Sequence, residues 1–261
     1  MASQEDIVLK SMIRKFITGC HILHYHRVLD AYGHLSFRHP SKPDVFLMSR
    51  YIAPATISSD RDVIEYYVSN AEPVDPNSPP GYSERCIHSE IYRRYPDVQS
   101  VVHSHSEAVV PYSISGTRTP VFDIAEHFQP DDIKDMLVRN TRLGAALAAC
   151  FADTPTATSP DHAVVLMRGH GFTTQASSIE ECVLRAVYTQ QNASIQTTAL
   201  LTHAAHFSAA PARATDAQAE VKYLDEEESQ ASGVMTKWSA YRPWGLWCRE
   251  VEASGLYVNQ A

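Results

Sequence analysis

Apolar residues recur at helical spacing in four stretches of the chain. The first stretch predicts a helix, or two helices broken near Gly19, over residues 5–30. The same pattern predicts helices over residues 85–95 and 131–152. A long amphipathic helix is expected from Ser177 to about Ala205, because serines followed by glutamates are typical of a helix start. The acidic run at residues 225–228 is expected to begin a last helix.

Shorter runs, either wholly apolar or alternating, predict strands between these helices. Residues 35–38 and 45–50 are expected to pair as a hairpin, because the segment that joins them contains two prolines. The other predicted strands are residues 63–68, 98–102, 163–167 and 172–174. The proline-rich residues 73–80 and residues 111–130 are expected to be loops.

The strand predicted over residues 98–102 leads directly into His103 and His105. Side chains alternate along a strand, so both imidazoles are expected on one face, where they can bind a single divalent metal ion. A His-x-His pair is also typical of a polar strand face on which the histidines are only hydrogen-bonded. The pair alone therefore does not decide between a metal site and a structural role.

Other residues favour the metal site. His170 ends a predicted strand and lies between Gly169 and Gly171, which allow the backbone to approach a site closely. Three neutral nitrogen ligands would leave coordination positions open for substrate oxygens, as in catalytic metal sites. Ser83 is expected to cap the helix that follows it. The helix, a turn and the next strand would then bring Glu84 back beside the histidine pair as an acid–base group.

Composition excludes several classes of partner. The chain has 261 residues and a formal net charge of -8, which argues against a nucleic acid or an anionic membrane as its main partner. No apolar run approaches the length of a membrane span, and the first residues are polar and acidic, unlike a signal peptide. Five scattered cysteines are typical of reduced thiols and predict a cytoplasmic protein.

Four motifs together resemble the class II aldolase/adducin amino-terminal domain family, from about Ile7 to Ala205 or beyond. The motifs are Gly33-His34-Leu35-Ser36, Ser83-Glu84 with His88, the run from Pro96 to His105, and Leu166-Met167-Arg168-Gly169-His170-Gly171. The resemblance implies an α/β protein, a three-layer α/β/α sandwich with a central, mainly antiparallel sheet. It also implies a homotetramer with sites near subunit interfaces.

The resemblance further assigns roles to residues of the proposed site. It implies one divalent metal ion per chain, zinc or manganese, held by His103, His105 and His170, with Glu84 as the catalytic glutamate. Residues 1–207 would be the metal-binding domain. Residues 208–261 would be a linker and a helical extension, packed on the same domain or on a neighbouring subunit, because three tryptophans lie close together there. The sequence leaves open whether the aromatic C-terminal segment, including Tyr257, reaches the site of a neighbouring subunit.

Differences from the family's sugar-phosphate aldolases indicate which branch the chain is similar to. Those aldolases usually carry Gly-Asn-x-Ser and two small hydroxyl residues before the glutamate, whereas His34 and Tyr82 stand at those places here. The chain looks more like the decarboxylase branch, which acts on hydroxylated pyridine or benzene carboxylates. His34 and Arg50 would then hold a carboxylate. The residues expected to bind substrate are His34, Ser36, Ser49, Arg50, Ser83 and His88.

The resemblance thus implies a metal-dependent carbon–carbon lyase that works through a metal-stabilised enolate. The favoured reaction is decarboxylation of a small hydroxylated aromatic or heteroaromatic carboxylate. Three alternatives stay open: a class II aldolase or retro-aldolase, an epimerase that uses the same enolate, and a non-catalytic adducin-like interaction protein. The loop over residues 115–122 is shorter than in other family members, in a region that would shape the substrate pocket.

Overall fold

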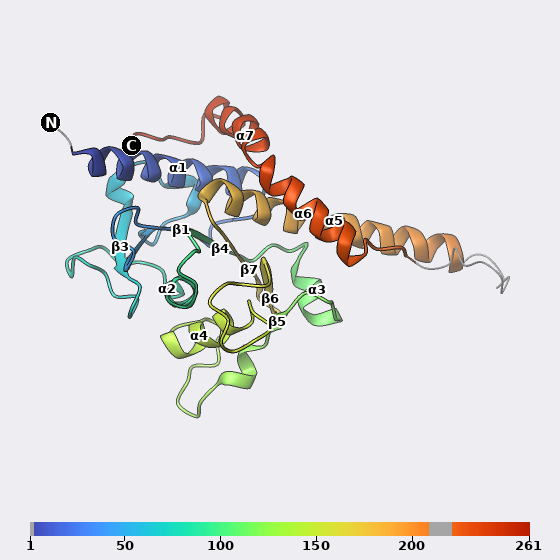
Figure 1. Ribbon diagram of the computed structural model, residues 1–261. Coiled ribbons are helices and arrows are strands. Elements are labelled where there is room, and N and C mark those ends of the chain that lie inside the picture. The colour runs from blue at the N-terminus through green and yellow to red at the C-terminus, as the bar shows by residue number, and fades with distance from the viewer. Residues whose placement is uncertain (1–2, 209–220) are drawn as a thin grey trace.

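A single sheet of seven strands lies at the centre of the computed structural model, which describes residues 3–208 and 221–261 (Figure 1). The order of strands across the sheet is β3-β2-β1-β4-β7-β6-β5. The strands are β1 (His34–Arg38), β2 (Val45–Ser49), β3 (Val63–Tyr67), β4 (Ser100–Ser104), β5 (Val121–Phe122), β6 (Val164–Met167) and β7 (Gly171–Ala176). All neighbours pair antiparallel except β5 and β6, so the prediction of a mainly antiparallel sheet is confirmed.

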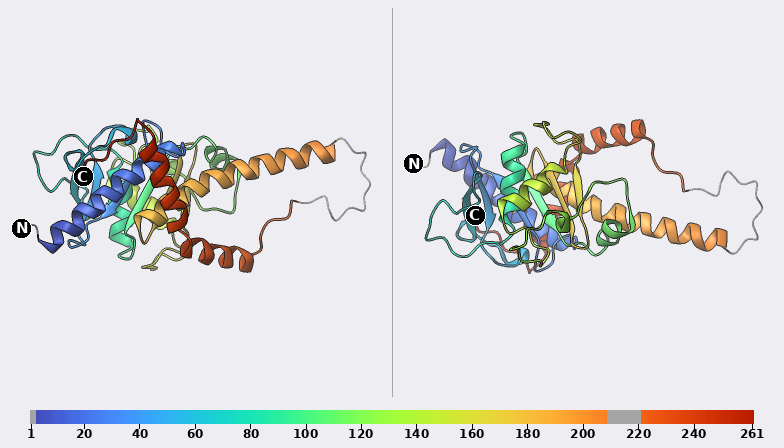
Figure 2. Two further views of the ribbon diagram at one scale, coloured as in Figure 1. Left: turned by 90° about the horizontal axis from the view of Figure 1, so that it is seen from above. Right: turned by 90° about the horizontal axis from the view of Figure 1, so that it is seen from below.

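Helices cover both faces of the sheet (Figure 2). One layer contains α1 (Gln4–Tyr25), α5 (Ile179–Ser208) and α7 (Tyr241–Ala253), and the other contains α2 (Arg85–Arg94) and α4 (Thr141–Ala149). Successive strand residues enter opposite cores: Val102 packs with the first layer and Val101 with the second. The predicted three-layer sandwich is therefore confirmed. The far half of α5 extends well beyond the sheet (Figure 2).

The first helix is continuous through Gly19. The helix α1 begins at a capping box in which Ser3 accepts from the amide of Asp6, and it runs unbroken to Tyr25. A side chain at position 19 would press against Leu35 and Val183, so the glycine serves close packing of the helix on the sheet. Of the two alternatives from the sequence, the single helix is correct.

The helix predicted over residues 131–152 begins ten residues later than expected. Asp132 and Asp135 accept hydrogen bonds from the backbone amides of Gln129 and Leu137, which stabilises turns and competes with helix formation. The helix α4 starts only after Asn140, whose side chain accepts from the amide of Leu143. The backbone before α4 is irregular, and its amides remain available to other groups.

Two smaller expectations also need correction. The N-cap of α2 is Glu84, without a side-chain cap hydrogen bond, so Ser83 does not cap that helix and is exposed to solvent. Residues 111–130 are not all loop, because they contain β5, most of α3 (Val110–Ser115) and the short 3₁₀ helix η3 (Ile124–His127). Two further 3₁₀ turns, η1 (Pro54–Thr56) and η2 (Asp60–Asp62), follow β2.

The C-terminal region adds two helices. Asp225 caps α6 (Glu226–Trp238), as expected for the start of a helix at the acidic run, whereas most of the expected linker lies outside the described residues. Trp247 of α7 is buried in the core with α1 and α5, but Trp238 at the end of α6 is 84% exposed. No helix within the described ranges is both long enough and apolar enough to cross a membrane.

Close packing between α2 and α4 provides a test of the fold. A Cβ atom at Gly144 would lie 2.4 Å from the carbonyl oxygen of Cys86, so Gly144→Ala forces the two helices apart. We expect this change to lower the free energy of unfolding by about 2 kcal/mol. The control is Gly233→Ala in α6, where no described residue outside the local helix backbone lies within 4 Å of the new Cβ, and a gain of about 0.5–1 kcal/mol is expected. Chemical denaturation of both variants measures the difference, and equal effects would contradict this packing.

Candidate metal centre

Three histidines meet where two central strands end. His103 lies near the end of β4, His105 follows that strand, and His170 occupies the turn between β6 and β7. Strands β4 and β7 are neighbours, with His103 directly opposite Thr173. A Cβ atom at Gly171 would lie 2.0 Å from the carbonyl oxygen of Ser104, so only glycine allows β7 to start this close to β4.

The ring nitrogens of these histidines converge on one point. The Nε2 atom of His105 lies 2.9 Å from Nε2 of His103 and 3.0 Å from Nε2 of His170. On the other side of His103, Nδ1 lies 3.2 Å from the hydroxyl oxygen of Thr173, which fixes the ring so that Nε2 faces the cluster. The sequence prediction that these three histidines share a site is therefore consistent with their geometry.

Glu84 joins the cluster from the N-terminal end of α2. Its Oε2 atom lies 3.7 Å from Nε2 of His103 and 3.8 Å from Nε2 of His170. Its Oε1 atom accepts a hydrogen bond of 3.0 Å from the backbone amide of Val138, one of the amides left available by the irregular segment before α4. Burial raises the pKa of Glu84 to about 7, and the hydrogen bond from Val138 opposes that rise. The carboxyl group can therefore hold or release a proton near neutral pH.

The chemistry of this donor set fits a divalent metal ion. Together, the four ligand atoms from Glu84, His103, His105 and His170 lie within 4.8 Å of one another. Neighbouring nitrogen ligands of a tetrahedral zinc ion lie roughly 3.3 Å apart, close to the separations in this cluster. Burial lowers the pKa of all three histidines, that of His170 to about 4, so the imidazoles are neutral, as metal ligands must be.

A second polar group lies directly beside the cluster. The ring of His34, which is opposite His103 across β1 and β4, has its centroid 5.2 Å from that of His103. Its Nδ1 atom lies 2.7 Å from Nε2 of His88, and Nδ1 of His88 lies 2.6 Å from the hydroxyl of Ser36. The Ser36 hydroxyl lies 2.6 Å from that of Tyr92, which ends the chain of hydrogen bonds. All four side chains are buried.

The remaining residues expected to bind substrate belong to two segments that pair through a single β-bridge, the end of β2 and the residues before Glu84. Arg50 forms an isolated β-bridge with Gly81, which brings it beside the segment that leads into Glu84. The Arg50 side chain is 42% exposed, and its Nε atom donates to Asp62 at 2.8 Å. Ser49 is buried and its hydroxyl forms a hydrogen bond with the hydroxyl of Tyr82. Ser83 is exposed to solvent.

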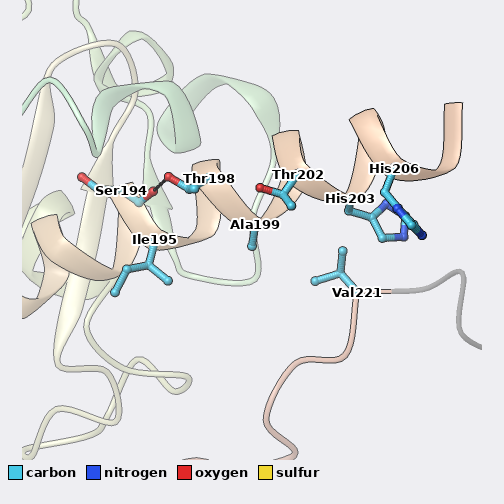
Figure 3. Close-up of a pocket in the computed structure, with 8 residues that line it drawn as sticks. All are labelled: Ser194, Ile195, Thr198, Ala199, Thr202, His203, His206 and Val221. Atoms are coloured by element: carbon cyan, nitrogen blue, oxygen red, sulfur yellow. Dashed lines mark hydrogen bonds between the residues drawn. The ribbon is translucent and has the colours of Figure 1, made fainter. Parts of the chain in front are cut away.

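A cavity of about 560 Å³ opens beside His105. Its lining includes Arg27, Asp30 and the C-terminal Tyr257, whose hydroxyl lies 2.9 Å from Nδ1 of His24. Tyr257 therefore lines a cavity of its own chain that is also lined by His105. A larger cavity of about 730 Å³ runs along the outer half of α5, with Val221 on the segment that faces this part of the helix (Figure 3). None of the residues predicted to form the site lines this larger cavity.

Three contributors to the site were not predicted from the sequence. Val138 contacts Glu84 only through its backbone amide, and such a contact leaves no signature in residue type. Thr173 was predicted to be in a strand, but its pairing with His103 depends on the register of β4 and β7. Tyr92 could have been found, because it lies four residues after His88 and therefore on the same face of α2.

Comparison with known proteins yields a family and several relatives. Residues 14–197 match the family model described as Class II Aldolase and Adducin N-terminal domain. The chain is 49% identical over 263 residues to Decarboxylase tropJ of Talaromyces stipitatus, an alignment that covers 95% of this chain and 97% of that protein. It is also 37% identical over 119 residues to 3,4-dihydroxyphthalate decarboxylase of Arthrobacter keyseri, covering 41% of this chain and 45% of that protein.

Solved structures support the fold. An aldolase II superfamily protein from Pseudomonas syringae superposes with a TM-score of 0.67 at 20% identity, over 98% of this chain and 96% of that chain. L-fuculose 1-phosphate aldolase from Glaciozyma antarctica PI12 superposes with a TM-score of 0.64 at 15% identity, over 97% and 92% of the two chains. At these identities the likeness establishes the shared architecture.

Proposed function

Because this chain belongs to the class II aldolase and adducin N-terminal domain family, we propose that it is a divalent-metal-dependent lyase. The proposed reaction is decarboxylation of a small hydroxylated aromatic or heteroaromatic carboxylate. The observation that carries the proposal is the cluster of three neutral imidazoles and one buried carboxyl group within 4.8 Å at the ends of central strands. Such a cluster has the ligands for a metal ion and a group for proton transfer.

His103, His105 and His170 would hold the metal ion. When bound, a divalent cation supplies a Lewis acid that lowers the energy of negative charge on substrate oxygens. Loss of carbon dioxide breaks the bond between the ring carbon and the carboxyl group and leaves the electron pair on the ring. The ring carbon must then receive one proton. Glu84 is suited to deliver it, because its pKa of about 7 allows it to be protonated near neutral pH and reprotonated by water.

The hydrogen bond from Val138 distinguishes the two oxygens of Glu84. Oε1 is engaged by the backbone amide, so Oε2 is the oxygen that faces the histidines and would carry the transferred proton. The same amide fixes the orientation of the carboxyl group, while burial keeps the pKa raised against the opposing effect of this hydrogen bond. This orientation of the carboxyl group supports Glu84 as the proton-transfer residue of the proposed site.

Substrate contacts are proposed for the residues that surround the cluster. His34 lies beside His103, and Arg50 adjoins the segment that leads to Glu84 and is partly open to solvent. An imidazole and a guanidinium group are both suited to binding a carboxylate. Ser49 and Ser83 belong to the same two segments, whereas Ser36 and His88 would act on the substrate through His34.

The names of relatives favour decarboxylation over aldol cleavage. The protein from Talaromyces stipitatus, which is similar over almost the whole chain, is named a decarboxylase, and the protein from Arthrobacter keyseri is named for a dihydroxylated aromatic dicarboxylate. We further propose zinc or manganese as the metal, a homotetramer with sites near subunit interfaces, and a cytoplasmic location. All five cysteines are free thiols, which agrees with a reducing compartment.

A substrate screen tests the proposed function. Metal-loaded protein is incubated with hydroxylated benzoates and pyridine carboxylates, including 3,4-dihydroxyphthalate, and carbon dioxide release is measured. A parallel assay follows aldehyde release from L-fuculose 1-phosphate. Carbon dioxide release that depends on added metal is the expected result. Aldehyde release without decarboxylation would instead support the aldolase alternative. The absence of both activities would support a non-catalytic role.

A further inference from the structure

We propose that Tyr92, at the inner end of a directed series of hydrogen bonds, determines which ring nitrogen of His34 carries the proton. This series of hydrogen bonds makes His34 an obligate Nε2–H donor towards an anionic oxygen of the substrate. The assignment of the ligand as a hydroxy-aromatic carboxylate rests on the proposed function, whereas the direction of the hydrogen bonds follows from the structure alone. Tyr92 is thereby a positioning residue for substrate recognition.

The chain of contacts contains four side chains and three short hydrogen bonds. From the interior outwards, the Tyr92 hydroxyl lies 2.6 Å from the Ser36 hydroxyl, which lies 2.6 Å from Nδ1 of His88. Nε2 of His88 then lies 2.7 Å from Nδ1 of His34. Ser36 and His88 are fully buried and Tyr92 is 1% exposed, so water does not take part at the inner end.

The direction of these bonds follows from counting protons. Among the described residues, the Ser36 oxygen is the one acceptor within reach of the Tyr92 hydroxyl, so Tyr92 must donate to it or leave a buried O–H group unsatisfied. The single Ser36 proton then goes to Nδ1 of His88. His88 therefore carries its proton on Nε2 and donates it to Nδ1 of His34. This leaves Nε2 as the only position for the proton of His34.

Hydrogen-bond donation in the opposite direction, from His34 towards Tyr92, is excluded because the Tyr92 hydroxyl would lack an acceptor among the described residues. If His34 donated to His88, His88 would donate to Ser36 and Ser36 would donate to Tyr92. The Tyr92 proton would then point into a buried region with no acceptor among the described residues, and a buried donor without a partner is unfavourable. The Tyr92 ring cannot turn away easily, because the guanidinium group of Arg38 lies over it at 4.8 Å and donates to the Tyr92 carbonyl oxygen.

A protonated Nε2 determines what His34 can bind. His34 and His103 lie opposite each other on adjacent strands with ring centroids 5.2 Å apart, so His34 adjoins the metal cluster. A nitrogen that carries a proton is not a metal ligand, which explains why His34 stands beside the three ligands without joining them. What it offers is one N–H donor without a competing acceptor atom. A carboxylate or phenolate oxygen is the substrate group that such a donor recognises.

Neutron diffraction tests the direction of the chain without any assay. Crystals of the metal-loaded protein are exchanged into D₂O, and joint neutron and X-ray refinement locates the deuterons. The expected result is a deuteron on Nε2 of both His34 and His88, with the Tyr92 deuteron pointing at Ser36. A deuteron on Nδ1 of either ring, or a second deuteron on His88, would overturn the proposal.

A pair of variants tests the consequence for binding. Tyr92→Phe removes the inner donor and allows the chain to reverse, and we expect affinity for salicylate, used as a hydroxy-carboxylate probe, to fall about tenfold. Metal content should not change. The matched control is Tyr95→Phe, since Tyr95 is also fully buried but donates to the Ala148 carbonyl oxygen, outside the chain. Calorimetric titration that gives equal affinities for wild type and Tyr92→Phe would contradict the positioning role.

A second pair of variants applies if Tyr92→Phe does not fold. The amide nitrogen of glutamine lies near the place of Nε2, and that of asparagine lies near the place of Nδ1. His34→Gln should therefore bind salicylate more tightly than His34→Asn, and the reverse order would contradict an Nε2–H donor. The two proposals fail separately: deuterons on Nε2 without any decarboxylation would refute the proposed function but leave the hydrogen-bond direction intact.

Discussion

Glu84→Gln is expected to slow carbon dioxide release by about 10²- to 10⁴-fold while the protein retains its metal ion. Glutamine has the same shape, and its carbonyl oxygen can still accept the hydrogen bond from Val138, so the local structure should persist. What the variant loses is the group whose pKa of about 7 permits proton transfer. Single-turnover kinetics with the substrate found in the screen, combined with elemental analysis, measure the two effects separately.

The matched control for this variant is Glu90→Gln. Glu90 lies on α2, which begins directly after Glu84, is 1% exposed and pairs with Arg93, away from the cluster. The control should keep its catalytic rate, although the lost ion pair can reduce stability. If Glu84→Gln instead loses its metal ion, Glu84 is a ligand and another group must transfer the proton. If Glu84→Gln decarboxylates at the wild-type rate, the assigned role is wrong.

The second large effect is expected from the histidines. Purified protein should contain about one zinc or manganese ion per chain, and His103→Ala or His170→Ala should reduce this to nearly none. Each variant removes one of three converging nitrogen ligands, and carbon dioxide release should be abolished with the metal. The midpoint temperature of thermal unfolding should also fall, because a ligand that binds only the folded state stabilises it. Inductively coupled plasma mass spectrometry gives the metal content.

A surface histidine supplies the control for these variants. His162 pairs with Asp153 at 2.8 Å in a loop outside the cluster, so His162→Ala should keep both metal and activity. A wild-type protein that holds no metal even after reconstitution would contradict the metal centre. It would shift the interpretation towards a non-catalytic, adducin-like interaction protein.

The strands and the three histidines of the cluster could be predicted from the sequence because each leaves a local pattern. Apolar residues before His103 and His170 indicate buried strands, and the glycines around His170 indicate a close backbone approach. The connectivity from Glu84 through a helix and a turn to His103 also predicts their meeting. These inferences need only the geometry of single elements and short connections.

The irregular backbone before α4 could not be predicted from the geometry of single elements. Apolar residues at helical spacing favour a helix there, but Asp132 and Asp135 bond to nearby backbone amides and stabilise turns instead. The competition is decided partly by tertiary contacts, because the free amide of Val138 is used by the Glu84 carboxyl group. Pairings across the sheet, such as His34 with His103, likewise depend on register, which the hydrophobic pattern of one strand does not specify.

The row that runs from His34 through His103 to Thr173 crosses three adjacent strands at one level of the sheet. Side chains alternate along each strand, so inserting or deleting one residue within β1, β4 or β7 would turn one member of the row to the opposite face. Changes of length over evolution would thus be restricted to the loops between these strands. The sheet interior would accept substitutions but not insertions, and new substrate preferences would arise from loops that border the cluster.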